Sequence, residues 1–245
     1  MSKLNVESIL VIIPARGGSK RIPDKNIREI FGQPMIYWPL MELRKIFNKD
    51  NILISTDSAI IKECVEKKGI KVPFMRPKNL SDDYIGTVPV VEHALSWFET
   101  NIKAVDYVLT VYPTAVLLRE EDIFAAMELL SNDGDCDSIM TATSFPFPIQ
   151  RAVFENDNGY AEMIEPDHYS SRSQDLIDAK HDAGQFYLSR AESVRKGLLL
   201  TNSNVKLQLL HKNNVVDIDT IEDFEIAEQK LHIYKKEKPN TLWKF

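Results

Sequence analysis

A short segment near the beginning of the sequence concentrates groups that could bind phosphate. Residues 14–26 read PARGGSKRIPDKN and contain a single acid, Asp24. The basic residues of the segment are Arg16, Lys20, Arg21 and Lys25. Gly17 and Gly18 would let the backbone turn with positive φ and bring its N–H groups close to a ligand, and Ser19 adds a hydroxyl. Because phosphate oxygens match all of these donors, the segment predicts a phosphate-binding loop.

Two better-known phosphate-binding signatures are absent from the sequence. There is no G-x-x-x-x-G-K-[ST], and no G-x-G-x-x-G follows the first predicted strand. These absences argue against a P-loop ATPase and against a dinucleotide-dependent dehydrogenase. A solvated basic turn is the alternative for residues 14–26, but the position after a strand and the density of donors favour binding.

Asp217 and Asp219 form a second candidate site. In an extended chain, residues two apart point to one face with about 7 Å between their Cα atoms. Mg²⁺ prefers a pair of carboxylates together with waters and substrate phosphates. The alternative is a helix start, with Asp219 or Thr220 as the cap and Glu222 and Asp223 near the positive helix end. On spacing alone, the helix start is the commoner explanation.

Hydrophobic periodicity predicts alternating strands and helices around these residues. Apolar runs indicate strands at 9–13, 51–55, 107–111, 138–143 and 185–188, and an extended piece at 215–218. Apolar residues at helical spacing indicate helices near 34–47, 58–68, 88–98, 120–130 and 221–231. This order predicts an α/β fold with a mostly parallel sheet and helices on both faces.

Residues 144–180 interrupt the alternation. They bring prolines, an Asn-Gly pair and hairpin-like pieces, with few long periodic segments. We interpret them as an insertion or arm within a domain made of 1–143 and 181–234, followed by a solvated basic tail at 235–245. The arm carries apolar residues without a periodic core of its own, so a partner surface is expected there. These residues are Phe145, Phe147, Ile149, Tyr160 and Met163.

Composition narrows the class of protein. The 245 residues include 44% hydrophobic and 27% charged positions, which is typical of a globular domain. A formal net charge of −6 gives no overall positive field to hold DNA or RNA. Cys64 and Cys136 are the only cysteines, and we expect core thiols in a reducing cytoplasm. The apolar run at 9–13 is too short to span a bilayer and lacks a signal-peptide layout, so no membrane partner is expected.

Four segments together resemble the acylneuraminate cytidylyltransferase family, whose members transfer CMP from CTP to an acidic nine-carbon sugar. They are PARGGSKRIPDKN at 14–26, ISTD at 54–57, FMRPKNLSDD at 74–83 and DIDT at 217–220, in the family's order. Further segments, FPFPIQRA at 145–152 and RSQDL with HDAGQFY between 172 and 187, look most similar to the pseudaminic acid branch. The resemblance implies a Rossmann-like nucleotidyltransferase fold and a homodimer that packs through the 144–180 arm.

The resemblance also implies a CTP site in the basic loop and its surroundings. The residues that would bind the nucleotide are Ala15, Arg16, Gly17, Gly18, Ser19, Lys25, Asn26, Arg76 and Thr87. Arg16 and Lys25 would neutralise phosphate charge during catalysis. Asp217 and Asp219 would be the catalytic carboxylates that hold Mg²⁺.

Two of these nucleotide residues also have simpler explanations. By resemblance Asn26 and Arg76 lie near the cytosine or ribose, and Thr87 occupies a position where the family carries a hydroxyl. Arg76 could instead be an ordinary surface arginine before Pro77. Thr87 could be a helix N-cap with Pro89 in the first turn.

An acceptor sugar acid carries a carboxylate, which calls for a strong hydrogen-bond donor. By resemblance Arg172 is a sugar-side arginine and Tyr187 is an aromatic residue beside the sugar. Further candidates on the sugar side are Tyr112, Gln150, Gln174, His181 and Gln185. For His181, a satisfied histidine without a catalytic task is the simpler interpretation.

Two departures from the family argue against sialic acid as the acceptor. Residues 112–119 read YPTAVLLR where sialic acid enzymes have QPTSPLR, and 181–187 lack their Arg-Pro-Asn run. Pseudaminic acid is therefore the expected acceptor, with legionaminic, sialic and Kdo-like acids as alternatives. The alternative from another class is a nucleotide-binding regulatory module without catalysis, which the intact basic loop and DIDT acids disfavour.

Overall fold

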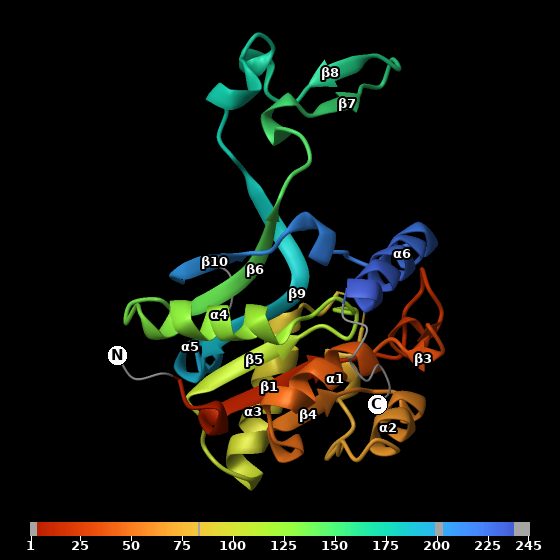
Figure 1. Cartoon of the computed structure of the whole chain (residues 1–245), viewed down its shortest axis with the longest axis vertical. Helices are drawn as coiled ribbons and strands as arrows, with labels where there is room; N and C mark the ends of the chain where they lie inside the picture. The colour runs from red at the N-terminus through yellow and green to blue at the C-terminus, as the bar shows by residue number, and fades with distance from the viewer. Residues whose placement is uncertain (1–3, 83, 199–202, 238–245) are drawn as a thin grey trace.

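The central element of the fold is a six-stranded sheet with the strand order β10-β6-β9-β5-β1-β4 (Figure 1). The computed structural model describes residues 4–82, 84–198 and 203–237. The strands of the sheet are β1 (Ile9–Pro14), β4 (Ile52–Ser55), β5 (Tyr107–Val111), β6 (Ser138–Ser144), β9 (Lys180–Arg190) and β10 (Val205–Leu209). A small hairpin beside it consists of β2 (Glu29–Ile30) and β3 (Gln33–Pro34).

The sheet is mostly parallel, as predicted. β1 pairs in parallel with β4 and β5, and β10 pairs in parallel with β6, whereas β9 lies antiparallel between β5 and β6. The chain leaves β1 for β4 on one side and returns to β5 on the other. The carboxyl ends of β1 and β5 therefore face a topological switch point, where open α/β sheets bind ligands.

Helices cover both faces because β1 sends alternate side chains to opposite sides. Ile9, Val11 and Ile13 belong to one core, and Leu10 and Ile12 belong to another. The helices on the first core are α1 (Tyr37–Ile46), α2 (Ala59–Glu66) and α4 (Glu120–Ser131). Those on the second core are α3 (Thr87–Asn101) and α5 (Ala191–Arg195). Helices on both faces were expected from the alternating pattern and are confirmed.

The strand predictions near the carboxyl end of the chain need correction. β10, at Val205–Leu209, was not predicted, although its valine and leucines alternate with polar residues as in a strand at a sheet edge. The extended piece expected at 215–218 joins no strand. Its apolar residues Val215 and Ile218 are instead buried in two separate hydrophobic clusters, and neither residue pairs with a strand of the sheet. Apolar character alone could not distinguish a buried connection from a strand.

The last described helix, α6 (Ile221–Glu237), is longer than expected. Phe224, Ala227 and Leu231 pack it into a third core with Trp38. The tail predicted from Lys235 is wrong in its first residues, because Lys235 is helical and its Nζ lies 4.9 Å from the centroid of the Phe31 ring. The remainder of the predicted tail, 238–245, lies outside the described residues.

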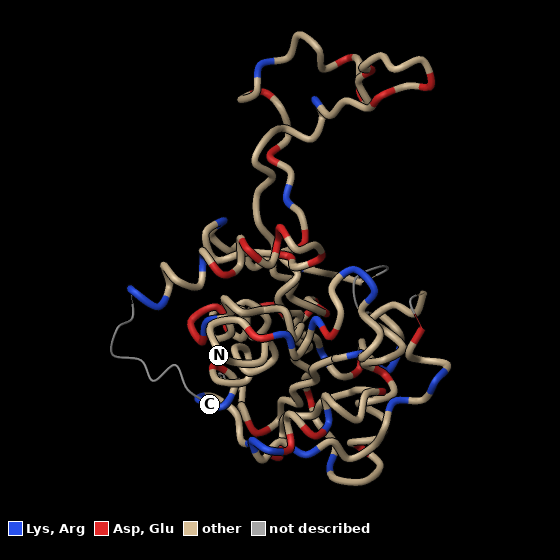
Figure 2. The backbone as a smooth tube through the Cα atoms, turned by 90° about the vertical axis from the view of Figure 1, so that its right-hand side faces the viewer, with Lys and Arg blue, Asp and Glu red and all other residues tan. Residues whose placement is uncertain are grey.

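An arm projects from the sheet between the end of β6 and the start of β9 (Figure 1). Figure 2 shows from the side that it extends well away from the body of the molecule. Within it, β7 (Val153–Glu155) pairs with β8 (Ala161–Met163). Several large apolar side chains of the arm are exposed, among them Phe147 at 80%, Tyr169 at 82% and Ile177 at 80%.

The two cysteines are free thiols, as expected. Cys136 is buried, whereas Cys64 is only partly buried beside the core that contains α1. Within residues 4–82, 84–198 and 203–237, no helix is both long enough and apolar enough to span a membrane.

The loop after β1 turns without positive φ at either glycine, contrary to expectation. The left-handed residue of the segment is Asp24, with φ of 52°. Gly17 is instead required by close approach, because a Cβ there would lie 2.8 Å from the Cβ of Ser58, the N-cap of α2. Its N–H donates to Oδ1 of Asp57 at 2.8 Å, which fixes the loop against the end of β4.

We therefore expect Gly17→Ala to lower the free energy of unfolding by about 1 to 3 kcal/mol, because the added methyl would press on the Cβ of Ser58, which cannot move without the backbone of α2. Gly18→Ala is the matched control, since a Cβ at Gly18 has open space around it. Denaturant unfolding of the two variants measures the difference. Equal stability of the two variants would contradict the close approach at Gly17.

Candidate active site

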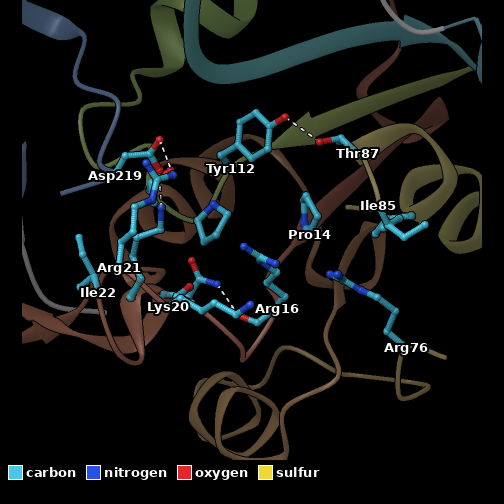
Figure 3. Close-up of a pocket in the computed structure, with 17 residues that line it drawn as sticks. Pro14, Arg16, Lys20, Arg21, Ile22, Arg76, Ile85, Thr87, Tyr112 and Asp219 are labelled. Carbon is cyan, nitrogen blue, oxygen red and sulfur yellow. Dashed lines mark hydrogen bonds and ion pairs between the residues drawn. The ribbon is translucent and has the colours of Figure 1, made fainter. Parts of the chain in front are cut away.

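A cavity of about 230 Å³ lies at the switch point, between the ends of β1 and β5 (Figure 3). Pro14 and Arg16 line it from β1 and its following loop, and Tyr112 and Thr114 line it from the loop after β5. The amino-terminal end of α3 contributes a further wall. The remaining lining residues are Ser19, Lys20, Arg21, Ile22, Lys25, Asn26, Arg76, Ile85, Gly86, Thr87, Val90, Pro113 and Asp219.

One side of the cavity is strongly basic. Arg16, Lys20, Arg21 and Lys25 all line it, and Figure 3 shows Arg16 between Arg21 and Arg76. Asn26 is buried, and its Nδ2 donates to the carbonyl of Arg16 at 2.8 Å, which holds the loop in shape. The sequence-predicted loop thus gathers its cations around one space. This is the arrangement that several adjacent phosphate groups require.

Ala15, Gly17 and Gly18 do not line the cavity through side chains. Ala15 is buried, and its N–H donates to the carbonyl of Ser55 at 2.9 Å. Ala15 and Gly17 fix the loop against Ser55 and Asp57, whereas Ser19 lies on the cavity wall.

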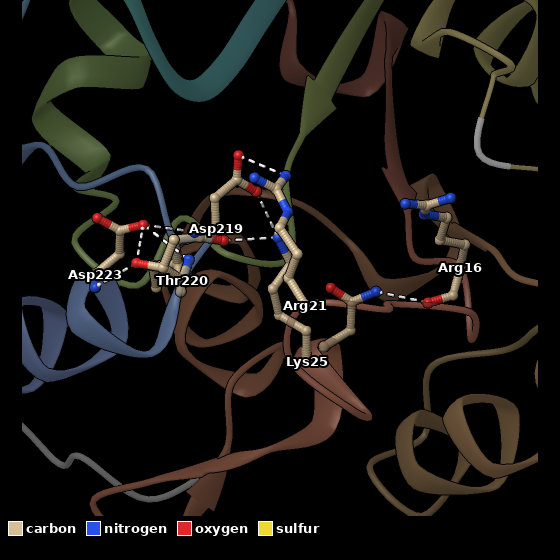
Figure 4. A network of polar contacts seen from close by, with 8 residues as sticks. Arg16, Arg21, Lys25, Asp219, Thr220 and Asp223 are labelled. Carbon is tan, nitrogen blue, oxygen red and sulfur yellow. Dashed lines mark hydrogen bonds and ion pairs between the residues drawn. The ribbon is translucent and has the colours of Figure 1, made fainter.

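Asp219 faces this basic side from the segment before α6 (Figure 4). Its Oδ1 lies 3.1 Å from Nζ of Lys25, and its Oδ2 lies 2.8 Å from the Arg21 guanidinium. Lys25 also donates to the carbonyl of Ile218 at 2.6 Å. Burial alone would raise the pKa of Asp219, but the hydrogen bond and charge of Lys25, with the charge of Arg21, outweigh burial and lower it. Asp219 is therefore held as a carboxylate.

Asp217 lies in a different electrostatic environment. Burial, and then the charge of Asp219, raise the pKa of Asp217, and Lys25 offsets this only in part. Gly184 packs against it, since a Cβ at Gly184 would lie 3.4 Å from Cγ of Asp217. Asp217 is thus a partly buried carboxylate whose negative charge is under-compensated, and a cation would stabilise it.

The helix-start alternative is resolved by Thr220 and Asp223. The Asp223 N–H donates to Oγ1 of Thr220 at 3.2 Å, and Asp223 Oδ2 accepts from the N–H of Thr220 at 2.8 Å. This reciprocal pair is a capping box at the start of α6. Thr220 is the cap, so Asp217 and Asp219 are not needed to begin the helix.

The surface-arginine alternative for Arg76 is wrong. Arg76 is buried, its Nε donates to Oγ of Ser55 at 3.1 Å, and its Nη2 donates to the Ser55 carbonyl. Burial lowers the pKa of its guanidinium. The side chain reaches the cavity with its direction fixed by the end of β4.

Thr87 is not the helix N-cap. Gly86 caps α3 and Thr87 is the first helical residue. The Thr87 hydroxyl lies 2.8 Å from the Tyr112 hydroxyl (Figure 3). Thr87 therefore links the start of α3 to the loop after β5 at the cavity wall.

The sugar-side candidates divide into two groups. Tyr112 lines the cavity, and the buried Tyr187 packs edge-on against it with ring centroids 5.8 Å apart. Gln185 is buried behind them, and its Nε2 donates to the carbonyl of Asn214. These three positions are brought together beside the cavity.

The other candidates lie on the arm or at its base, and none of them is among the residues that line the cavity of their own chain. Arg172 is exposed and pairs with Asp175 at 2.8 Å, while Gln174 lines a separate depression of the arm. Gln150 Nε2 donates to the Ile177 carbonyl at 3.0 Å. His181 at the arm's base has Nδ1 2.8 Å from the carbonyl of Asp182, and its ring packs on Phe145.

Asp182 is a polar residue that the sequence reasoning did not single out. Its Oδ2 accepts a hydrogen bond from the Tyr187 hydroxyl, and its charge acts on Asp217. The only available signal was its place in HDAGQFY, between His181 and Gln185. A single aspartate two residues before a glycine gave no reason to expect it beside Tyr187.

The residues present fit Mg²⁺, provided that a ligand completes the site. Among the described residues, no group of three or more His, Cys, Asp or Glu side chains could hold a metal ion. Asp219 lines the phosphate-sized basic cavity, and Asp217, two residues before it, supplies a second carboxylate close enough for the two charges to interact. Magnesium is bound in this way, through one or two carboxylates, waters and substrate phosphates.

Comparison with known proteins agrees with this geometry. The family profile described as Cytidylyltransferase matches residues 10–238. Pseudaminic acid cytidylyltransferase of Campylobacter jejuni is 39% identical over 218 residues, which cover 89% of this chain and 94% of that protein. CMP-N,N'-diacetyllegionaminic acid synthase of Legionella pneumophila is 26% identical, with 92% of this chain and 97% of that protein covered.

Solved structures show the same fold. CMP:2-keto-3-deoxy-manno-octonic acid synthetase complexed with CTP superposes with a TM-score of 0.66 at 16% identity, covering 94% of this chain and 99% of that one. For 4-diphosphocytidyl-2C-methyl-D-erythritol synthase from Anaerococcus prevotii the TM-score is 0.60 at 17% identity, with coverage of 91% and 96%. The Rossmann-like nucleotidyltransferase fold is therefore confirmed. By the family profile and by its similarity to the Campylobacter protein, this chain belongs to the cytidylyltransferase family of nucleotidyltransferases.

Proposed function

We propose that this protein transfers CMP from CTP to pseudaminic acid and releases pyrophosphate. The observation that carries the proposal is the cavity at the switch point, where a cluster of cations faces Asp219 in a chain of the cytidylyltransferase family. The pseudaminic acid cytidylyltransferase of Campylobacter jejuni, similar over most of both chains, supports the choice of acceptor. We include a cytoplasmic location in the proposal, in keeping with two free cysteines.

CTP would place its triphosphate against the loop after β1. Arg16, Lys20 and Lys25 line the space there and carry the positive charge that the phosphates need. The buried Arg76 and Asn26 lie on the same cavity and would face the ribose or cytosine. Because their hydrogen bonds to the protein already hold them in place, little ordering is left to occur on binding.

Asp217 and Asp219 would hold Mg²⁺ together with phosphate oxygens of the nucleotide. When bound, the ion would neutralise negative charge that develops on the phosphates. The salt bridges of Asp219 with Lys25 and Arg21 keep both cations at the same place. Cations and carboxylates of the protein thus lie side by side at the place where the phosphates of the nucleotide would bring the most negative charge.

The reaction joins the anomeric 2-hydroxyl oxygen of the acid sugar to the α-phosphorus of CTP. The bond from that phosphorus to the bridging oxygen breaks in line, pyrophosphate leaves with the electron pair, and the hydroxyl proton passes to solvent. Catalysis would consist mainly of alignment and charge neutralisation by Arg16 and Lys25, because phosphoryl transfer asks little covalent chemistry of the protein.

Other acceptors remain as alternatives on the sugar side. The Legionella relative is named for a legionaminic acid product, and the Streptococcus agalactiae N-acylneuraminate cytidylyltransferase is 30% identical over 88% of this chain. Pyrophosphate release from CTP against a panel of pseudaminic, legionaminic, sialic and Kdo-type acids tests the acceptor. We expect the highest kcat/KM with pseudaminic acid. A chain that binds CTP in calorimetry but releases no pyrophosphate with any acid would instead be a regulatory module.

We also propose a homodimer that forms through the arm and brings Gln150, Arg172 and Gln174 to the neighbouring cavity. The exposed apolar side chains of the arm support a partner surface. The sugar-side residues of the arm do not line the cavity of their own chain, so a second chain would complete the site.

One prediction of the proposed function concerns the carboxylate pair. Asp217→Asn and Asp219→Asn should each lower turnover by about 100-fold or more, since charge stabilisation at the phosphates is lost. Their free energies of unfolding should change by less than about 1 kcal/mol. The ion pairs of Asp219 are partly exposed and therefore weak, and burial already disfavours the charged form of Asp217. Pyrophosphate release at limiting Mg²⁺, paired with denaturant unfolding, measures both effects.

The matched control is Asp223→Asn, four residues further along the same segment. It weakens the capping box of α6, so it should cost about 1 kcal/mol of stability and keep most of the turnover. If Asp217→Asn or Asp219→Asn retained near wild-type pyrophosphate release at limiting Mg²⁺, the metal assignment would be wrong.

A further prediction tests whether sites are shared between subunits. Arg172→Ala and Asp219→Asn should each be nearly inactive alone, since each removes a different part of every site. When the two variants are mixed and their subunits exchange, half of the dimers contain one subunit of each variant. One of the two sites in such a dimer is intact, so the mixture should recover about a quarter of wild-type activity. Light scattering after size-exclusion chromatography checks that mixed species are dimers. A stable monomer at micromolar concentration, or no recovery among confirmed mixed dimers, would contradict shared sites.

A further inference from the structure

The end of β4 contacts two segments that lie far apart in the sequence. Ser55 is the last residue of β4, and Thr56 and Asp57 follow it. Ser55 and Thr56 are completely buried. Their hydrogen-bond partners include the loop after β1 and Arg76, which both line the cavity. Residues 55–57 therefore join two parts of the cavity wall.

Two hydrogen bonds attach the loop after β1 to residues 55–57. The Ala15 N–H donates to the carbonyl of Ser55 at 2.9 Å, and the Gly17 N–H donates to Oδ1 of Asp57 at 2.8 Å. Arg16 lies between these two attachment points in the sequence and lines the cavity. The position of the basic loop is therefore set by the end of β4.

Arg76 is attached to the same end of β4 through its backbone and through its side chain. Its backbone N–H donates to the carbonyl of Thr56 at 2.7 Å. Its Nε donates to Oγ of Ser55 at 3.1 Å, and its Nη2 donates to the carbonyl of Ser55. In Figure 3 the guanidinium points toward Arg16. Because Arg76 is buried, these hydrogen bonds decide where its charge lies in the cavity.

The carbonyl and the hydroxyl of Ser55 have different partners. A carbonyl oxygen has two lone pairs, and the Ser55 carbonyl accepts both from Ala15 and from the Arg76 guanidinium. The Ser55 hydroxyl accepts from Arg76 and, within the part of the chain that the structure describes, from no residue of the loop. Removal of the hydroxyl would therefore loosen Arg76 and leave both attachments of the loop in place.

We propose that Ser55 is a positioning residue whose hydroxyl directs the Arg76 guanidinium to the nucleoside part of CTP, at a fixed distance from the phosphate-binding loop. This inference rests on the proposed function, in which the triphosphate lies on that loop and Arg76 faces the ribose or cytosine. The end of β4 fixes the separation of the two before the nucleotide binds, so less ordering is needed on binding. Both side-chain hydrogen bonds of Arg76 end on neutral oxygens of Ser55, which leaves the positive charge for the ligand.

The test is Ser55→Ala, titrated by calorimetry with two ligands in the presence of Mg²⁺. CTP reports on the loop and on Arg76, whereas inorganic tripolyphosphate reports on the loop alone. We expect the Kd for CTP to rise about tenfold, because Nε of a charged, buried side chain loses its acceptor. The Kd for tripolyphosphate should stay within about twofold of wild type.

Ser138→Ala is the matched control. Ser138 is a completely buried serine at the start of β6, its Oγ donates to Oγ of Ser189 at 2.8 Å, and neither serine lines the cavity. This variant also loses one buried hydroxyl, yet both dissociation constants should stay within about twofold of wild type.

A double-mutant cycle tests whether Ser55 acts through Arg76. Arg76→Met should itself weaken CTP binding, and adding Ser55→Ala to it should have little further effect. Additive effects of the two substitutions would overturn the inference. So would an unchanged Kd for CTP in folded Ser55→Ala, or an equal rise in Kd for CTP and tripolyphosphate, which would indicate a displaced loop.

The wild-type measurements distinguish this inference from the proposed function. If wild type binds no CTP, both fail. If wild type binds CTP but releases no pyrophosphate with any acid, the proposed transfer fails, and the titrations still decide the role of Ser55. If wild type turns over and Ser55→Ala binds CTP as Ser138→Ala does, only the role of Ser55 is refuted.

Discussion

The attraction between the basic loop after β1 and Asp219 connects the two ends of the domain. Lys25 and Asp219 are 194 positions apart in the sequence, yet their side chains meet at 3.1 Å. Without a nearby negative charge, the cations of the loop would repel one another. In a protein of net charge −6, Asp219 supplies that negative charge at the loop. The packing of Phe224 and Trp38 in the third core keeps α6 where this contact is possible. Electrostatics and apolar packing thus support the same geometry at the cavity.

The architecture could be predicted from sequence because its signals are local and repetitive. β1 is apolar at every position of Ile9–Ile13, and this pattern has one simple explanation, a strand covered on both faces. The place of the basic loop in the fold follows from the geometry of parallel sheets, because their ligands bind beyond the carboxyl ends of the strands. The capping role of Thr220 was one of two options that spacing left open, and it took hydrogen bonds to decide between them.

Features that depend on tertiary contacts could not be predicted in this way. The need for glycine at position 17 comes from Ser58, which packs against it from a different element. Burial of Arg76 depends on the hydroxyl and carbonyl of Ser55, and nothing in the residues around position 76 shows this. Asp182 gains its partners only because a bulge folds β9 back on itself. These positions are defined by residues far away in sequence, where periodicity carries no information.

The arm continues into β9, which carries the Tyr187 that packs against Tyr112 of the cavity wall, and this constrains how the chain can change in length. Residues inserted within 145–179 would enlarge the arm and leave the pairing of β9 with β5 untouched. One residue inserted between Asp182 and Tyr187 would instead reverse the faces of the strand on one side of the insertion, and the aspartate and the tyrosine would no longer meet. Insertions and deletions in related chains should therefore accumulate in the arm and stop at its base. The arm can therefore vary in length outside Gln150 and residues 172–174, while the bulge of β9 between Asp182 and Tyr187 keeps its length.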